Sequence, residues 1–285
     1  MILFRSRIPV LACGAALLLA GSSAARGAAE KVTFHFAPPL GKTYLATSKV
    51  TTAIATPRGK VRVLETEIAS RLRTDRAGQQ IQQTFSVISA VNKLDGSPMD
   101  SPLTQVLPGL DVTFALGADG QIVDLVNFAG LLDRVRKSIP PERFEAVTPF
   151  FTAEALLARR RAAADPLVSA LAGKTLAVGE TTTGNGTVTL PTGDAFPVRL
   201  SVTLKGRERT SACDCLRIDF TTQPILQSGK PADVGATGQG TALIDPATLL
   251  TWSLRHEQQI VKQEPGAPQL QKITLTVEDS LAPGR

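Results

Sequence analysis

Apolar and polar side chains alternate along most of residues 31–126, which is the pattern of strands that bury one face. In VRVLETEIASRLRT, Leu64, Ile68 and Leu72 fall on the same face of an extended chain. Turn signals separate the alternating segments, and Asp119-Gly120 is a clear one, because glycine readily takes the positive φ of a tight hairpin turn. The first part of the chain therefore predicts an antiparallel β-meander with one solvent-facing side.

The pattern changes to a helical period between residues 127 and 172. Leu131, Leu132 and Val135 recur at helical spacing, and a pair of prolines ends this first helix. A second helix is expected over PERFEAV, because proline is tolerated in the first turn of a helix. A third amphipathic helix is expected over FFTAEALLARRRAAA.

The third predicted helix ends with Arg159, Arg160 and Arg161, and Asp165-Pro166 then begins a separate short helix that ends at Gly173. Cations near a helix C-terminus are favoured by the helix dipole, by about 0.3–1 kcal/mol each. We therefore interpret the arginine triplet as structural. The alternative is peripheral contact with anionic lipid head groups at a membrane surface.

Alternation returns between residues 185 and 280, where FPVRLSVTL and CLRIDFTTQ flank a hairpin loop. The whole pattern predicts an α+β fold, a curved antiparallel β-sheet that forms a half-barrel of two β-meanders and is covered by a central helical insert. The single β-rich domain, residues 30–285, then consists of a β-meander, a helical lid and a second β-meander over residues 31–126, 127–172 and 173–280.

The first 29 residues have the three-part layout of a secretory signal peptide. Arg5 and Arg7 precede the apolar segment IPVLACGAALLLAG, and small residues follow it. Cleavage near Ala25 or Ala29 fits the small-x-small rule. The apolar segment is too short to span a bilayer, which takes about 20 apolar residues, so we expect a periplasmic or secreted protein.

The sequence contains 31 Lys and Arg residues and 25 Asp and Glu residues, a formal charge of +6. The predicted signal peptide holds three of the arginines and no acidic residue, which leaves +3 for the exported chain. So small a charge gives no basic footprint for a nucleic acid. Trp252 and Tyr44 are the only residues of their kinds, so stacking platforms are scarce. We expect no nucleic-acid partner, and the sequence indicates no oligomeric state.

Cys213 and Cys215, in SACDCLRIDF, are the most site-like feature of the chain. On a strand, residues i and i+2 lie about 6.5 Å apart on one face, whereas a disulfide needs Cβ atoms about 3.5–4.5 Å apart. The pair can therefore bridge only where the hairpin loop is still turning. We interpret the two cysteines as ordinary free thiols. A loop disulfide, a metal clip and a redox pair are the alternatives.

The sequence shows no motif for catalysis or for a cofactor. A zinc site needs further ligands, and the chain has only His35 and His256, without metal-ligand spacing. The nucleophile motif G-x-S-x-G is not present. His256 and Glu257 are neighbours on a strand and face opposite ways, so this carboxylate does not orient this imidazole. We predict no catalytic residue, no metal and no cofactor.

Three segments, LGKTYLATSKV, VTFALGADGQIVDLVN and LAVGETTT, resemble a family of uncharacterised exported bacterial proteins. The expected layout looks like the half-barrel of lipoprotein-carrier and lipid-binding envelope proteins. This resemblance implies the fold and the binding of an apolar ligand, and it transfers no functional residue.

We expect a non-enzymatic envelope protein that binds an apolar small molecule or lipid under the helical lid. Leu131, Leu132 and Val135 are the predicted ligand-lining residues. One alternative is a structural or protein-interaction domain whose helices fill the concave side of the sheet. The other is a hydrolase without a recognisable motif. A cavity on the order of several hundred Å³ would favour binding, and a histidine with a carboxylate and a Ser or Thr in one cleft would favour the hydrolase.

Overall fold

In the computed structural model the described residues are 30–55, 59–148, 151–189, 195–226, 235–263 and 270–284, so the predicted signal peptide lies outside them. The alternating segments of the sequence form long strands. The strands are β1 (Lys31–Thr33), β2 (Thr43–Ala55), β3 (Val61–Ala77), β4 (Gln80–Leu94), β5 (Ser97–Pro98), β6 (Asp111–Leu116), β7 (Ile122–Val126), β8 (Thr175–Ala177), β9 (Thr181–Thr189), β10 (Ala195–Arg209), β11 (Asp214–Pro224), β12 (Gly235–Ile244), β13 (Thr251–Gln263) and β14 (Leu270–Pro283).

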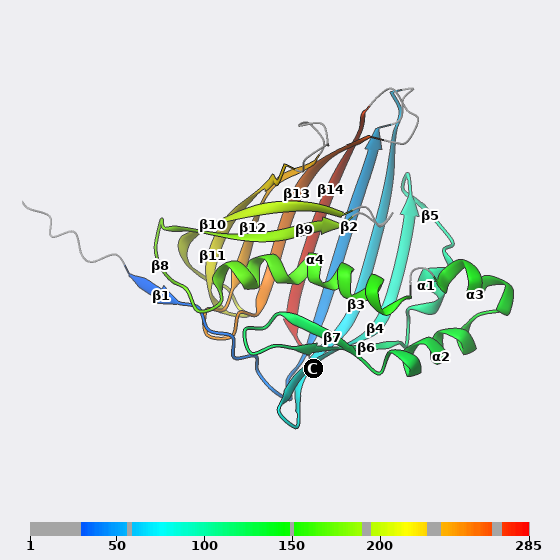
Figure 1. Cartoon of the computed structure of the whole chain (residues 1–285), viewed down its shortest axis with the longest axis horizontal. Coiled ribbons are helices and arrows are strands. Elements are labelled where there is room, and N and C mark those ends of the chain that lie inside the picture. The colour runs from blue at the N-terminus through cyan, green and yellow to red at the C-terminus, as the bar shows by residue number, and fades with distance from the viewer. Residues whose placement is uncertain are drawn as a thin grey trace, which may run out of the picture.

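Most of these strands form one curved antiparallel sheet (Figure 1). Its first arm runs in the order β7, β6, β4, β3, β2, and its second arm runs β14, β13, β12, β11, β10, β9. The arms join where β2 pairs with β14, so the first and the last long strands of the chain lie side by side. Outside this path, β5 pairs with β4, and β1 pairs with β8. The predicted fold class, an α+β half-barrel of two β-meanders, is confirmed.

The burial of the strands follows their alternation. In β3, Leu72 is buried, whereas Arg71 and Arg73 on either side of it are exposed. The predicted turn between β6 and β7 also forms, with Gly120 at φ +87°. Because Gly120 has no Cβ, the ring of Phe36 lies against the turn, where an added Cβ would overlap the ring.

The helices within the described residues are α1 (Pro102–Val106), α2 (Phe128–Ser138), α3 (Pro141–Val147) and α4 (Ala153–Leu171). α2 and α3 coincide with two predicted helices, whereas α1 was not predicted. α4 lies across the concave side of the sheet and contacts both edge strands, β9 and β7 (Figure 1). It therefore spans the opening of the half-barrel from one arm to the other.

The predicted helix break at Asp165-Pro166 is wrong, because α4 continues through Pro166. A proline inside a helix costs about 3 kcal/mol, since it removes one backbone hydrogen bond and crowds the preceding turn. Here the proline ring lies directly against β9, where a Cβ added to Gly186 would be 2.7 Å from the proline Cγ. Packing against the edge of the sheet therefore outweighs the local signal.

The core consists of three clusters of buried side chains. The first lies between β10–β12 and the C-terminal half of α4 and includes Phe34 and Leu167. The second lies between β6, β7 and the helices and includes Phe114 and Phe151. The third occupies the concave face of β10 and β12–β14 and includes Leu275.

Candidate ligand-binding cavity

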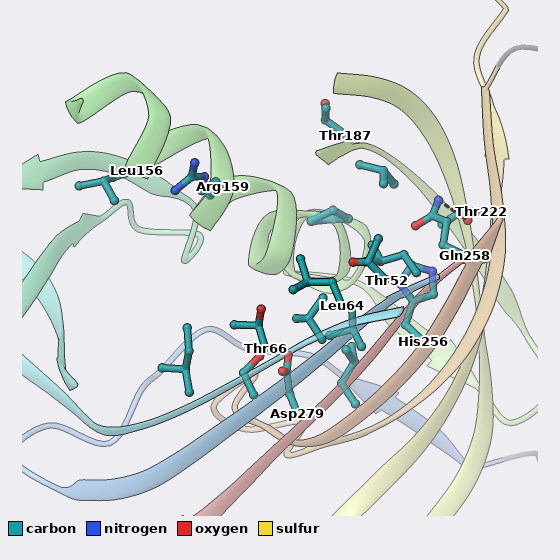
Figure 2. A pocket seen from close by; sticks show the side chains of 18 of the residues that line it. Thr52, Leu64, Thr66, Leu156, Arg159, Thr187, Thr222, His256, Gln258 and Asp279 are labelled. Carbon is teal, nitrogen blue, oxygen red and sulfur yellow. Dashed lines mark hydrogen bonds between the residues drawn. The ribbon is translucent and has the colours of Figure 1, made fainter. Parts of the chain in front are cut away.

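A cavity of about 580 Å³ lies between the concave face of the sheet and α4. Strands β2, β3, β13 and β14 form its floor, β9–β11 form one wall, and α4 lies above the floor (Figure 2). All three core clusters border it, through Leu167, Phe151 and Leu275 respectively. The cavity is therefore the region where the three clusters meet without filling the concave side of the sheet.

Strand pairing aligns the lining residues into rows that run across the sheet. In one row Thr52 pairs with Leu275, Leu275 with Gln258, Gln258 with Gly238, and Gly238 with Thr222. We call this the Gln258 row. Thr52, Gln258 and Thr222 are only 4%, 1% and 5% exposed, so the row carries polar groups that are shielded from water.

The neighbouring row, which we call the His256 row, contains Thr66, Val50, Val277, His256 and Gly240. The imidazole packs beside the Phe220 ring, with 5.2 Å between ring centroids. Burial lowers the pKa of His256 from 6.5 to about 4, because the charged form loses its hydration. The imidazole is therefore neutral at neutral pH.

Charged groups lie elsewhere on the cavity lining. Asp279 is one row further along β14, between Ser48 and Leu254. Burial raises the pKa of its carboxyl group, whereas the Ser48 hydroxyl and the positive charge of Arg160 act in the opposite direction. On α4, Arg159 lines the cavity, and burial lowers the pKa of its guanidinium group.

A histidine, a carboxylate and several hydroxyls thus share one cavity, which is the combination expected of a hydrolase. However, among the described residues His256 Nε2 has no hydrogen-bond partner. The Asp279 carboxylate instead accepts a hydrogen bond from the Ser48 hydroxyl, and both residues lie outside the His256 row. An activated nucleophile needs a hydrogen bond to its base, and among the described residues no such bond reaches His256 Nε2.

The predicted ligand-lining residues on α2 pack outside this cavity. Leu131 is 2% exposed and Val135 is fully buried, both within the second core cluster, and Leu132 packs against that cluster. None of the three is among the residues that border the cavity. The part of the helical segment that lies over it is α4, together with Phe151 just before it.

The two cysteines form a disulfide in the structure, so the free-thiol interpretation is corrected. Their Cα atoms are 5.3 Å apart, because Cys213 still belongs to the hairpin loop and β11 begins one residue later. The Thr210 hydroxyl accepts a hydrogen bond from the Cys213 amide at 3.1 Å and thereby helps to hold the loop turned. The bridge lies away from the cavity lining.

The arginine triplet lies inside α4, so its predicted place at a helix C-terminus is wrong. Arg161 donates two hydrogen bonds of 2.9 Å to the Ile122 and Val123 carbonyls of edge strand β7. Arg160 donates to Gln83 Oε1 at 3.0 Å. Two of the three guanidinium groups therefore attach α4 to the first arm of the sheet. Contact of the triplet with lipid head groups stays a prediction.

Among the described residues, no group of three or more His, Cys, Asp or Glu side chains is placed to hold a metal ion. None of the helices described has both the length and the hydrophobicity that are needed to cross a membrane.

No protein-family model and no curated protein matches the sequence. Among solved structures, lipovitellin is 13% identical over 88% of this chain with a TM-score of 0.47, and the chain spans only 26% of the lipovitellin chain. An exported protein with a YmcC-like fold from Bacteroides fragilis is 9% identical, with 86% of this chain and 97% of that chain covered and a TM-score of 0.24. Because these sequence identities and TM-scores are low, we infer function from the cavity alone.

Sequence reasoning missed Gln258 and Thr222 as candidate site residues. Alternation did place His256 and Gln258 on the same face as Ile260, which is fully buried. A polar side chain at a strand position where the alternation predicts an apolar one was therefore the signal that could have identified Gln258. The strand pairing that brings Thr222 next to them was not readable from the local pattern.

Proposed function

We propose that the protein binds an apolar small molecule or a lipid chain in the cavity beneath α4. The observation that carries this proposal is an unfilled space of about 580 Å³ that is bordered by all three core clusters. Protein interiors pack as densely as organic crystals and contain few voids larger than a water molecule. Small-molecule pockets measure about 300–1,000 Å³ and are mostly apolar, with a few polar groups. The cavity has the size and the lining of such a pocket.

We also propose that binding takes place outside the cytoplasm. The pattern of residues 1–29 supports export. The Cys213–Cys215 disulfide supports the same compartment, because disulfides persist in oxidising environments such as the bacterial periplasm.

Filling the cavity with a side chain tests the proposal. Val50 lies on the floor, so Val50→Trp places an indole in the space that a ligand would occupy. Val91→Trp is the matched control, since Val91 is 46% exposed on the strand two positions away in the sheet order. Both substitutions suit a strand, because aromatic residues have a high β-propensity.

The measurement is titration with the apolar fluorescent probe N-phenylnaphthylamine, accompanied by native mass spectrometry of the protein for co-purified molecules. We expect saturable binding to the wild type and to Val91→Trp, and a loss of at least about tenfold in affinity for Val50→Trp, which corresponds to about 1.4 kcal/mol. Absence of binding to the wild type, or equal binding by both variants, would contradict the proposal and favour the structural domain.

A further inference from the structure

The Gln258 amide is only half satisfied. Its Nε2 donates a hydrogen bond to Thr222 Oγ1 at 3.3 Å. Its Oε1 has no partner among the described residues, although the side chain is only 1% exposed. Figure 2 shows this amide at the cavity, with the oxygen directed away from Thr222. A buried polar group without a partner is costly, so a partner supplied by a ligand would offset a real penalty.

The His256 imidazole presents a second polar group of the same kind. Its Nε2 is buried and has no hydrogen-bond partner among the residues that the structure describes. A neutral imidazole carries one donor and one acceptor nitrogen. His256 and Gln258 are two residues apart on β13, so both face the cavity about 6.5 Å apart along the strand.

Two glycines of β12 pack closely against these groups. A Cβ added to Gly238 would lie 2.6 Å from the Glu257 carbonyl oxygen, 2.9 Å from Thr222 Oγ1 and 3.0 Å from His256 Nε2, so only a glycine lets these atoms come so close to β12. A Cβ added to Gly240 would overlap the Phe220 ring that packs beside the imidazole. These two glycines therefore let the side chains of the Gln258 row and the His256 row pack directly against the backbone of β12.

The charges around the cavity restrict what can bind at this end. Besides the neutral imidazole of His256, the described residues of the lining include two ionisable side chains, Arg159 on α4 and Asp279 on β14. Neither belongs to the Gln258 row or to the His256 row. A carboxylate head group bound beside these two rows would face the Gln258 carbonyl oxygen, and neither row has a cation to neutralise it. An ammonium head group at the same place would find no carboxylate in either row.

We propose that the ligand is an apolar molecule with a neutral hydroxyl group, and that this hydroxyl binds between Gln258 Oε1 and His256 Nε2. The inference rests on the proposed function, because it assigns the head group of the same ligand. A hydroxyl both donates and accepts, so it can donate to the amide oxygen and also pair with the imidazole nitrogen. The remaining surface of the cavity receives the apolar part.

Displacement of N-phenylnaphthylamine by decanol, undecane and decanoate tests the head group. Gln258→Met removes the amide but keeps the length of the side chain, and Gln259→Met makes the same change on the exposed face of β13. We expect Gln258→Met to weaken the binding of decanol by about tenfold, because the buried hydroxyl of decanol then loses its hydrogen-bond partner. Undecane should be unaffected, and Gln259→Met should bind all three compounds like the wild type.

The outcomes separate the two proposals. If none of the three compounds displaces the probe from the wild type, the proposed function fails. If Gln258→Met weakens decanol and undecane equally, or if decanoate binds more tightly than decanol, only the hydroxyl assignment fails. Should Gln258→Met not fold, His256→Leu serves for the same comparison, with the same selective loss of decanol expected.

Discussion

The acid titration of His256 measures how far the cavity excludes water from the imidazole. Burial lowers the pKa of this imidazole from 6.5 to about 4. Between these values the unfolded chain binds a proton that the folded chain does not bind. The free energy of unfolding should therefore fall as the pH is lowered from about 6.5 to about 4, and His256 should contribute nothing to this change above pH 6.5.

The size of the effect follows from the same pKa values. Each pKa unit corresponds to 1.36 kcal/mol, so complete titration gives at most about 3 kcal/mol, and less where water reaches the ring. Asp279 acts in the opposite direction, because a raised carboxyl pKa stabilises the fold at low pH and this contribution is lost as the pH rises. The contribution of Asp279 to the free energy of unfolding cancels when the wild type is compared with His256→Gln, since both proteins retain Asp279.

The assay is urea unfolding at a series of pH values from 7 to 4, followed by the fluorescence of Trp252, the only tryptophan of the chain. Relative to His256→Gln, the wild type should lose about 2–3 kcal/mol across this range. His35→Gln is the control, because His35 is exposed and lies outside the cavity lining. A constant difference between wild type and His256→Gln from pH 7 to pH 4 would refute the reasoning and place the imidazole in water.

Two further predictions concern residues outside the cavity. Leu131→Ala should cost about 2–5 kcal/mol of unfolding free energy without changing probe affinity, because Leu131 is packed in the second core cluster; weaker probe binding by a stably folded variant would contradict this placement. Iodoacetamide should leave Cys213 and Cys215 unmodified in the oxidised protein, and two carbamidomethyl groups should appear after reduction, as seen by intact mass. Alkylation without a reductant would show that the bridge is not formed.

The sequence determined the features that depend on neighbouring residues. Alternation in β3 identified the buried face that contains Leu64 and Leu72, because successive side chains of a strand point to opposite sides. Helical spacing located α2, and Asp119-Gly120 located the β6–β7 turn, because both signals lie within a few residues. Even the Cys213–Cys215 bridge was limited by local geometry to a turning loop, although the sequence did not show that the loop turns far enough.

Tertiary structure decided what depends on distant parts of the chain. The pairing of β2 with β14 joins the first and the last long strands of the chain, and no local pattern specifies it. The continuity of α4 through Pro166 depends on its packing against Gly186 of β9, and its attachment to the first arm depends on Arg161 and the carbonyls of β7. As a result α4 lies over the cavity, whereas the more regularly patterned α2 packs into a filled core.

The cavity itself is the clearest example of this difference. Whether space remains between a sheet and a helix depends on the volumes of side chains from three clusters, and a single segment reveals none of these volumes. Gln258 could be placed on the inner face of β13 from its sequence neighbours. That its amide oxygen has no partner among the described residues follows only from the strands and the glycine placed beside it.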